Sequence, residues 1–295
     1  MQDPCGSRSR EAFSLGRARV AVVAARGLHA HERVEERSVF PFPGLARRLP
    51  ADPARATLPG AMCGRFFLSK SGVEIARHFD LATEPVLAPR FNIAPSQAIA
   101  VVRRRASDAC GRVLELRTWG FVPRFAKDVR AGRRPINARA ETLATNPLFR
   151  DAFAHRRGLV PADGFYDWQH RGRSARPFAL RVRGGELFAM AALFDHCKTA
   201  EAELDSCAIV TTGANERVAA IHDRMPAILA LPDYALWLDP AVHEPERLLP
   251  LLQPCPAEWI DLQPVSRRVN DVRCDDAQLI EAERDLFSPC GGGGT

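Results

Sequence analysis

The sequence predicts an α+β fold with a largely antiparallel, barrel-like β-sheet core and flanking helices. Between residues 62 and 285, strand-like runs outnumber helical runs and do not alternate with them as in βαβ units. The chain has 295 residues, of which 46% are hydrophobic and 26% charged, so it can bury a substantial core. It contains no run of 18 apolar residues, so we expect no membrane-spanning helix.

The first part of this region predicts one helix and two paired strands. Residues 71–80 have the apolar spacing of a short amphipathic helix. This helix would turn four side chains inward: Val73, Ile75, Ala76 and Phe79. Residues 98–104 and 112–121 have β-like composition and flank a turn at 106–111.

The second part predicts a further helix and then several strands. Residues 146–157 can form a helix, because Asn146 suits the N-cap, Pro147 suits the first helical position, and basic residues close the segment. We expect strands at 158–168, 177–183, 187–194 and 207–213. We expect helices at 232–238, at 244–252 and near 275–285.

The two ends of the chain differ from the region between them. Residues 1–61 show no sustained periodicity, which fits a disordered tail, a targeting peptide or sequence translated from a misplaced start. The acidic residues Glu32, Glu35 and Glu36 favour the misplaced start, since Arg-rich transit peptides are poor in acids. We therefore expect a disordered or spurious leader at 1–61, one domain at 62–285 and a flexible tail at 286–295.

Charge and cysteine usage say little about partners but suggest a compartment. The net charge of +6 is concentrated in residues 1–61, which hold ten arginines and six acids and leave 31 basic and 29 acidic residues elsewhere. The eight cysteines form no CxxC pair, so neither a zinc site nor a disulfide framework is indicated. A reducing cytoplasm fits this pattern.

Cys63 stands out because of the segment Met62-Cys63-Gly64-Arg65, which has the pattern of a protein start. An internal cysteine has only a thiol, and a neighbouring arginine can lower its pKa. If Cys63 were the first residue, it would also carry an α-amine with an ordinary pKa of about 8. Such an aminothiol reacts with an aldehyde to give an imine and then a thiazolidine ring.

Three further segments carry polar side chains suited to chemistry. Asn137, Arg139 and Glu141 alternate, so a strand would place them on one face; a solvated face is the plainer interpretation. Asp163 and Asp167 flank a glycine turn beside aromatic residues. Desolvation of Asp167 next to Trp168 would raise its pKa for acid–base work, although an ordinary turn is as compatible.

The third segment, residues 219–226, contains a histidine and an arginine two residues apart. His222 can exchange protons near neutral pH, and Arg224 can bind phosphate. Pro226 would stiffen the loop that positions both, whereas a lone histidine is usually structural.

Taken together, these segments resemble the SRAP family, the SOS-response-associated peptidases, whose best-understood members process abasic sites in DNA. The resemblance covers residues 62 to about 282 and rests on nine motifs in order. These are MCGRF (62–66), RFNIAPSQ (90–97), WGFVPRFAKD (119–128), INARAET (136–142), LVPADGFYDW (159–168), FAMAALF (188–194), VTTGAN (210–215), IHDRMPAIL (221–229) and VSRRVNDVR (265–273).

The resemblance implies a role for individual residues. Cys63 would be the catalytic residue, N-terminal after loss of Met62, that forms a thiazolidine with the aldehyde of an abasic site in single-stranded DNA. Asn137 would orient it, and His222 would assist proton transfer. DNA contacts would come from Arg65, Pro95, Trp119, Arg139, Trp168 and Arg224, with Pro95 in a loop that wedges against the DNA. The resemblance implies no cofactor and no metal, and we expect a monomer in the cytoplasm, nucleoid-associated when bound to DNA.

One residue departs from the family pattern. The family usually has glutamate in the motif GFYEW, and here the residue is Asp167, whose carboxylate is one methylene shorter. We expect crosslinking to be retained with an altered rate, and Glu141 is a possible substitute for the longer carboxylate. Two other functions stay open: a cysteine peptidase that cleaves itself before Cys63, and a non-catalytic binder of single-stranded DNA.

Overall fold

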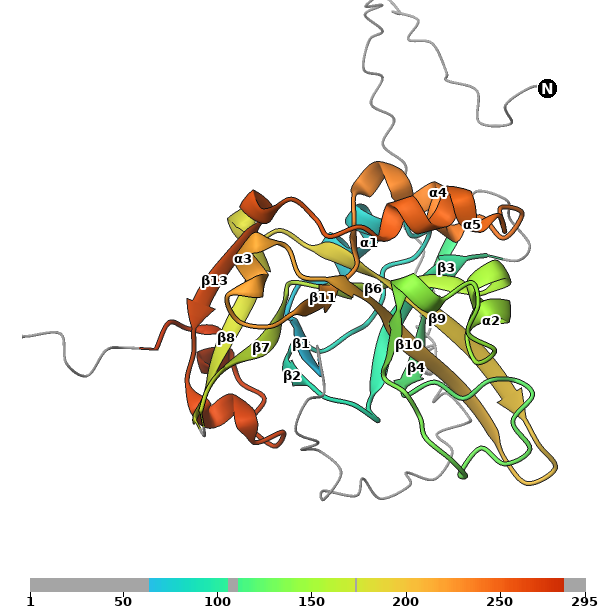
Figure 1. Cartoon of the computed structure of the whole chain (residues 1–295), viewed down its shortest axis with the longest axis horizontal. Helices are drawn as coiled ribbons and strands as arrows, with labels where there is room; N and C mark the ends of the chain where they lie inside the picture. Colours follow the sequence, from blue (N-terminus) through green and yellow to red (C-terminus); the bar gives the residue numbers. More distant parts are fainter. Residues whose placement is uncertain (1–63, 106–110, 173, 284–295) are drawn as a thin grey trace, which may run out of the picture. The chain divides into compact units, whose positions relative to one another are not determined.

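The computed structural model describes residues 64–105, 111–172 and 174–283, which all lie in one compact unit, Pro50–Thr295 (Figure 1). The leader at 1–61, Cys63, most of the turn at 106–111 and the tail at 286–295 lie outside the described residues. None of the described helices is long and apolar enough to span a membrane.

A closed ring of five strands forms the centre of the fold. These strands are β3 (Ala98–Arg104), β4 (Arg112–Trp119), β6 (Arg157–Ala162), β9 (Phe188–Lys198) and β10 (Glu203–Gly213). The order β10–β4–β3–β6–β9 closes because β9 also pairs with β10, and within the ring only the β4–β10 pair is parallel. The predicted α+β fold with a largely antiparallel, barrel-like core is confirmed. We call this ring the barrel.

A second sheet lies outside the barrel and is entirely antiparallel. Its order is β13 (Ile260–Pro264), β8 (Ser174–Val182), β7 (Gly164–Arg171), β1 (Arg65–Leu68) and β2 (Arg90–Ile93). The single strand predicted at 158–168 is therefore two strands, β6 in the barrel and β7 in the second sheet. The chain changes sheet at Gly164, where a Cβ atom would lie 2.2 Å from the ring of Phe67.

The remaining elements are short. Three strands extend the barrel: β5 (Asn137–Arg139), β11 (Arg224–Pro226) and β12 (Ile228–Leu229). The α-helices are α1 (Gly72–Phe79), α2 (Arg150–His155), α3 (Glu216–Ala219), α4 (Tyr234–Leu238) and α5 (Pro245–Leu248). Single 3₁₀ turns occupy Ala140–Thr142, Arg183–Gly185, Leu231–Asp233, Leu249–Leu252, Ala257–Trp259, Arg267–Asn270 and Ala277–Ile280.

The helices match the sequence prediction unevenly. Helix α1 begins at a capping box formed by Ser71 and Glu74, but Val73 is 48% exposed and does not face the core as predicted. Helix α2 begins at Arg150, three residues after the predicted first helical position, Pro147. The side chain of Asn146 instead caps the preceding turn by accepting a hydrogen bond from the backbone N–H of Leu148 at 2.9 Å.

At the C-terminal end of the described chain, the helix predicted near 275–285 is a single 3₁₀ turn, Ala277–Ile280. Asp276 caps this turn, and its side chain accepts a hydrogen bond from the Gln278 backbone N–H at 3.1 Å. Short polar residues at such a position favour turns over helix interiors.

A buried arginine ties the barrel to the helices beside it. Arg157, at the start of β6, is 4% exposed, and its guanidinium donates hydrogen bonds to five backbone carbonyl oxygens. These carbonyls belong to Phe153, Ala154, Trp237, Asp239 and Val242. The cation therefore satisfies the carbonyl ends of α2 and α4, which would otherwise be buried without donors.

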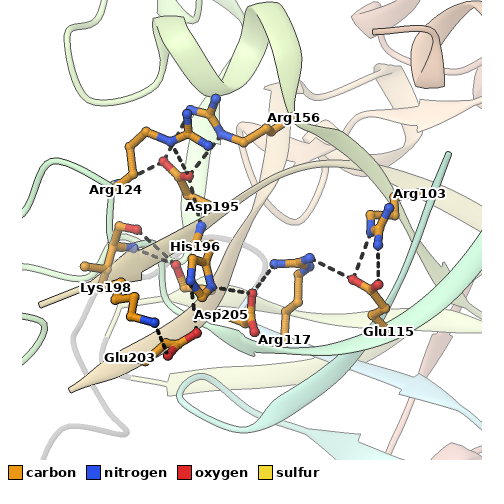
Figure 2. Close-up of polar contacts among 12 residues, drawn as sticks. Arg103, Glu115, Arg117, Arg124, Arg156, Asp195, His196, Lys198, Glu203 and Asp205 are labelled. Carbon is orange, nitrogen blue, oxygen red and sulfur yellow. Dashed lines mark hydrogen bonds and ion pairs between the residues drawn. The ribbon is translucent and has the colours of Figure 1, made fainter. Parts of the chain in front are cut away.

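Ion pairs cross one face of the barrel and anchor the loop that leads to β5 (Figure 2). Arg117 on β4 donates to Glu115 and to Asp205, both at 2.8 Å, and His196 on β9 contacts Asp205 at 3.3 Å. The residue before His196 on β9, the buried Asp195, accepts a hydrogen bond from the backbone N–H of Arg124 at 2.9 Å. This last contact fixes the loop between β4 and β5, and β5 carries Asn137.

Candidate functional site

The candidate site begins where the chain enters the second sheet. Arg65 pairs with Tyr166 and Phe66 with Phe165, so continuing this register by one residue sets Asp167 opposite Gly64. Cys63 itself lies outside the described residues. The next residue in the chain, Gly64, is described and leads directly into β1, beside the part of β7 that carries Asp167.

Asp167 has the properties expected of an acid–base group. Its side chain is 3% exposed, and Oδ1 accepts a hydrogen bond from the Trp168 backbone N–H at 2.9 Å. Oδ2 is buried and has no hydrogen-bond partner among the described residues. Burial raises the pKa of the carboxyl to about 6, against smaller opposing effects of His222 and of the Trp168 N–H. The carboxyl can therefore gain and lose a proton close to neutral pH.

His222 lies just before β11 and is close enough to Asp167 to influence its ionisation. Its Nδ1 atom lies 3.0 Å from the backbone N–H of Arg224 and 2.9 Å from Oδ1 of Asp223. A neutral imidazole accepts from the amide, whereas an imidazolium donates to the carboxylate. Both protonation states are thus provided with a partner, as proton transfer requires.

Arg224 is held from two sides within the fold. Its guanidinium makes a two-pronged ion pair with Glu141 and donates to the backbone oxygen of Thr211 at 2.7 Å. Glu141 lies in the 3₁₀ turn after β5 and not in the strand, so it does not share the strand face of Asn137 and Arg139 as predicted. The pair instead bridges two segments next to β10.

Asn137 and Arg139 are both on β5, which runs parallel to β10 and pairs with it from Ile209 to Thr211. Asn137 is half-buried, and Arg139 is exposed. Since Gly213 on β10 pairs with Arg224, strands β5 and β11 both lie beside the C-terminal part of β10. Gln169, at the end of the site on β7, donates to the backbone oxygen of Ala220 at 2.9 Å and so links the second sheet to the segment before His222.

Two of the residues predicted to contact DNA are structural. Trp119 is fully buried, donates from Nε1 to the Ile136 oxygen at 2.8 Å and packs edge-on against Phe66, so it cannot stack on a base. Arg65 is 7% exposed and donates to Asn92 at 3.0 Å and to the Val269 oxygen at 2.7 Å. Its donors are used inside the protein, which does not fit the predicted role of holding phosphate.

Trp168 and Pro95 remain accessible. Trp168 is half-buried, and its Nε1–H donates to the side-chain oxygen of Asn270 at 2.8 Å. Pro95 is half-buried in the tight turn between β2 and β3, where Ser96 has a positive φ of 69°. The turn is fixed by the Ser96 N–H, which donates to the Trp119 oxygen at 2.8 Å.

Sequence reasoning missed the segment that supports Trp168. We call residues 266–276 the strap. Asn92 is fully buried and places its amide nitrogen within 3.2 Å of the backbone oxygens of Val269, Asp271 and Cys274 in the strap. In the sequence, this segment was marked only by the motif at 265–273, to which no role was assigned.

No group of His, Cys, Asp and Glu side chains within residues 64–105, 111–172 and 174–283 has an arrangement that could hold a metal ion. The carboxyl of Asp167 and the imidazole of His222 lie close together, and Asn137 and Arg224 lie on the two short strands beside β10. Such a set supports proton transfer and the binding of anions.

The barrel and its second sheet define an α+β protein in which a buried carboxyl and an imidazole lie close together. Residues 62–272 match the family described as SOS response associated peptidase (SRAP). The chain belongs to the SRAP family.

Relatives and a solved structure agree with this assignment. Abasic site processing protein YoqW of Bacillus subtilis is 38% identical over 226 residues, which is 75% of this chain and 100% of YoqW. Abasic site processing protein YoaM of the same organism is 36% identical over 230 residues, covering 76% of this chain and all of YoaM. A crystal structure of a Bacteroides thetaiotaomicron protein shares the fold, with a TM-score of 0.66 at 21% identity over 75% of this chain and all of the other.

Proposed function

We propose that this protein processes abasic sites in single-stranded DNA by forming a covalent thiazolidine through Cys63, exposed as the N-terminal residue. The observation that carries the proposal is Asp167: a buried carboxyl with one unpartnered oxygen among the described residues and a raised pKa, set opposite Gly64. The names of the relatives and the start of the family match at residue 62 support it.

The chemistry proceeds in two steps. The Cys63 α-amine attacks the aldehyde of the ring-opened sugar, and the resulting carbinolamine loses water to give an imine. The Cys63 thiol then adds across the C=N bond: an S–C bond forms, and the nitrogen takes up the proton. No oxidant or reductant is needed, and the ring resists hydrolysis better than the imine does.

Each step needs protons to be moved at a defined place. Asp167, with a pKa of about 6, takes a proton from the attacking amine and returns one to the departing hydroxyl. His222, with partners for both of its protonation states, shares this task. Asn137 holds the nucleophile in the orientation for attack, which lowers the entropy cost of the reaction.

Binding of the strand is assigned to the accessible polar and aromatic groups. Arg139 is exposed and contributes a phosphate contact, which makes binding dependent on salt and independent of sequence. Trp168 offers a ring on which a base can stack. Pro95, in the turn between β2 and β3, is assigned the role of a wedge against the DNA.

The test is incubation of protein that begins at Cys63 with a single-stranded oligonucleotide containing one abasic site, followed by denaturing electrophoresis. A shifted band that survives denaturation is expected, and Cys63→Ser should abolish it, because the serine hydroxyl can give only an oxazolidine ring, which hydrolyses much more readily than a thiazolidine. A matched control is protein that retains Met62, which has the thiol but no α-amine on Cys63. Binding without any band from the wild-type protein would refute the proposal and favour a non-catalytic binder.

The shorter carboxylate offers a second test. Asp167→Glu extends the side chain by one methylene, which is about 1–1.5 Å of reach by ordinary bond lengths. We expect the variant to form the crosslink with an altered rate and to reverse it faster than the wild type. Single-turnover kinetics of formation and release measure both, and identical rates would show that carboxylate length is irrelevant.

A second function is favoured by the word peptidase in the family description. Attack of the Cys63 thiol on the Met62 carbonyl would break the C–N bond, transfer the acyl group to sulfur and free the α-amine. Water would then hydrolyse the thioester and release residues 1–62 as a carboxylic acid. Full-length protein and its Cys63→Ala variant, followed by intact mass, test this step. Loss of residues 1–62 from the variant as well would assign the cleavage to another enzyme.

A further inference from the structure

The strap is fastened to the second sheet by two buried side chains. Arg65 on β1 donates to the Val269 oxygen at 2.7 Å and to the Asn270 oxygen at 3.4 Å. Asn92 on β2 accepts from Arg65 at 3.0 Å and donates into the strap. Asn92 donates to the backbone oxygens of Val269 and Asp271, which flank Asn270 in the chain. The backbone of Asn270 is therefore fixed on both sides.

With its backbone fixed, Asn270 directs its side chain at Trp168. The Asn270 Oδ1 atom accepts from the indole Nε1–H at 2.8 Å, across 102 residues of sequence. The backbone N–H of Trp168 is held by Asp167 at 2.9 Å, so the residue is restrained at both its backbone and the far end of its ring. A half-buried indole held at only one of these points could rotate about its side-chain bonds.

We propose that Asn270 is a positioning residue, which sets the plane of the Trp168 indole for stacking on a base of the bound strand and acts through a strap anchored by Arg65 and Asn92. The assignment rests on the proposed function for its DNA partner. Pre-set side chains bind more tightly because less freedom is lost on association. This role also explains why Arg65 is buried, because its guanidinium holds the strap and does not contact phosphate.

The first arm of the test uses the free protein and needs no DNA. The near-ultraviolet circular dichroism of the wild type minus that of Trp168→Phe isolates the signal of this indole from those of the other three tryptophans. Asn270→Ala should remove most of that signal with the melting temperature little changed. Asn270→Asp retains an acceptor oxygen and should restore the signal.

The second arm measures binding by anisotropy with an oligonucleotide carrying a tetrahydrofuran abasic analogue, which cannot react. Asn270→Ala should weaken binding about fivefold, in line with the net effect of one hydrogen bond. In a Trp168→Phe background the same substitution should have no further effect. A fivefold loss that persists in that background, or an unchanged dichroism signal in Asn270→Ala, would overturn the inference. Failure of the wild type to crosslink an abasic site would refute the proposed function alone and leave the dichroism result standing.

Discussion

Ionisation of Asp167 should destabilise the folded protein at neutral pH. The pKa of this carboxyl rises from its ordinary value of 3.8 to about 6 on folding, because burial disfavours the charged form. The native state therefore binds more protons than the unfolded state between about pH 4 and pH 6. The free energy of unfolding therefore falls as the pH rises through that window. Above it, burial of the charged carboxylate lowers the free energy of unfolding by about 3 kcal/mol.

Asp167→Asn removes the charge and should raise stability where that cost applies. Asparagine keeps an acceptor for the Trp168 N–H. It also buries an NH₂ group without a hydrogen-bond partner, and this cost of about 1–2 kcal/mol offsets part of the gain from removing the charge. We therefore expect a net gain of about 1–2 kcal/mol at pH 7.5, a smaller or reversed difference at pH 4, and loss of most crosslinking.

Urea unfolding of the wild type and Asp167→Asn at pH 4, 5, 6 and 7.5 measures the difference directly. Glu201→Gln is a suitable control, because Glu201 is exposed and the change should be within about 0.5 kcal/mol. A difference between wild type and Asp167→Asn that does not change across this pH range would refute the assignment of a raised pKa to Asp167.

Three further outcomes test the fold and the DNA interface. Arg157→Met should lower the free energy of unfolding by about 3–5 kcal/mol, because buried carbonyl oxygens lose a charged donor; chemical denaturation measures the loss, and a change under 1 kcal/mol would contradict it. Gly164→Ala should cost about 1–3 kcal/mol, since its Cβ would lie 2.2 Å from the Phe67 ring, whereas Gly213→Ala, with no atom within 4 Å, should be close to neutral in the same assay. Arg139→Gln should weaken binding of single-stranded DNA equally for all sequences and reduce the slope of log K against log salt by about 1, and an unchanged slope would exclude a phosphate contact.

Strands of the barrel could be predicted from the sequence because strand periodicity is a local property, whereas closure of the ring depends on pairings such as β4 with β10. The runs at 98–104 and 112–121 contain β3 and β4, with the second strand ending at Trp119. The division of 158–168 between two sheets could not be predicted, because it depends on the contact of Gly164 with Phe67, 97 residues before it in the chain. Helix starts were equally uncertain, as Asn146 can cap either a helix or a turn.

For the site, residue type indicated chemistry but not exposure. Trp119 and Trp168 are both tryptophans within motifs, yet only Trp168 of the two is accessible, since Trp119 is fully buried and packs against Phe66. Arg224 was expected to bind phosphate, but its guanidinium pairs with Glu141. These two residues are 83 apart in the chain, so no local sequence pattern indicated the pair. The raised pKa of Asp167 was expected from its apolar neighbours, and the structure agrees in direction.

The bond between Arg65 and Val269 joins residues 204 apart, so the site depends on the last part of the domain to be synthesised. While a ribosome is still extending the chain, β1 is synthesised before the strap. The Arg65 guanidinium then lacks the carbonyl oxygens of Val269 and Asn270 that accept its hydrogen bonds. A cation in that position is unfavourable to bury, so the second sheet should not close until residues near 270 have emerged. The order of synthesis thus delays assembly of the second sheet, and a chain truncated before the strap would lack the carbonyl oxygens that hold Arg65 in place.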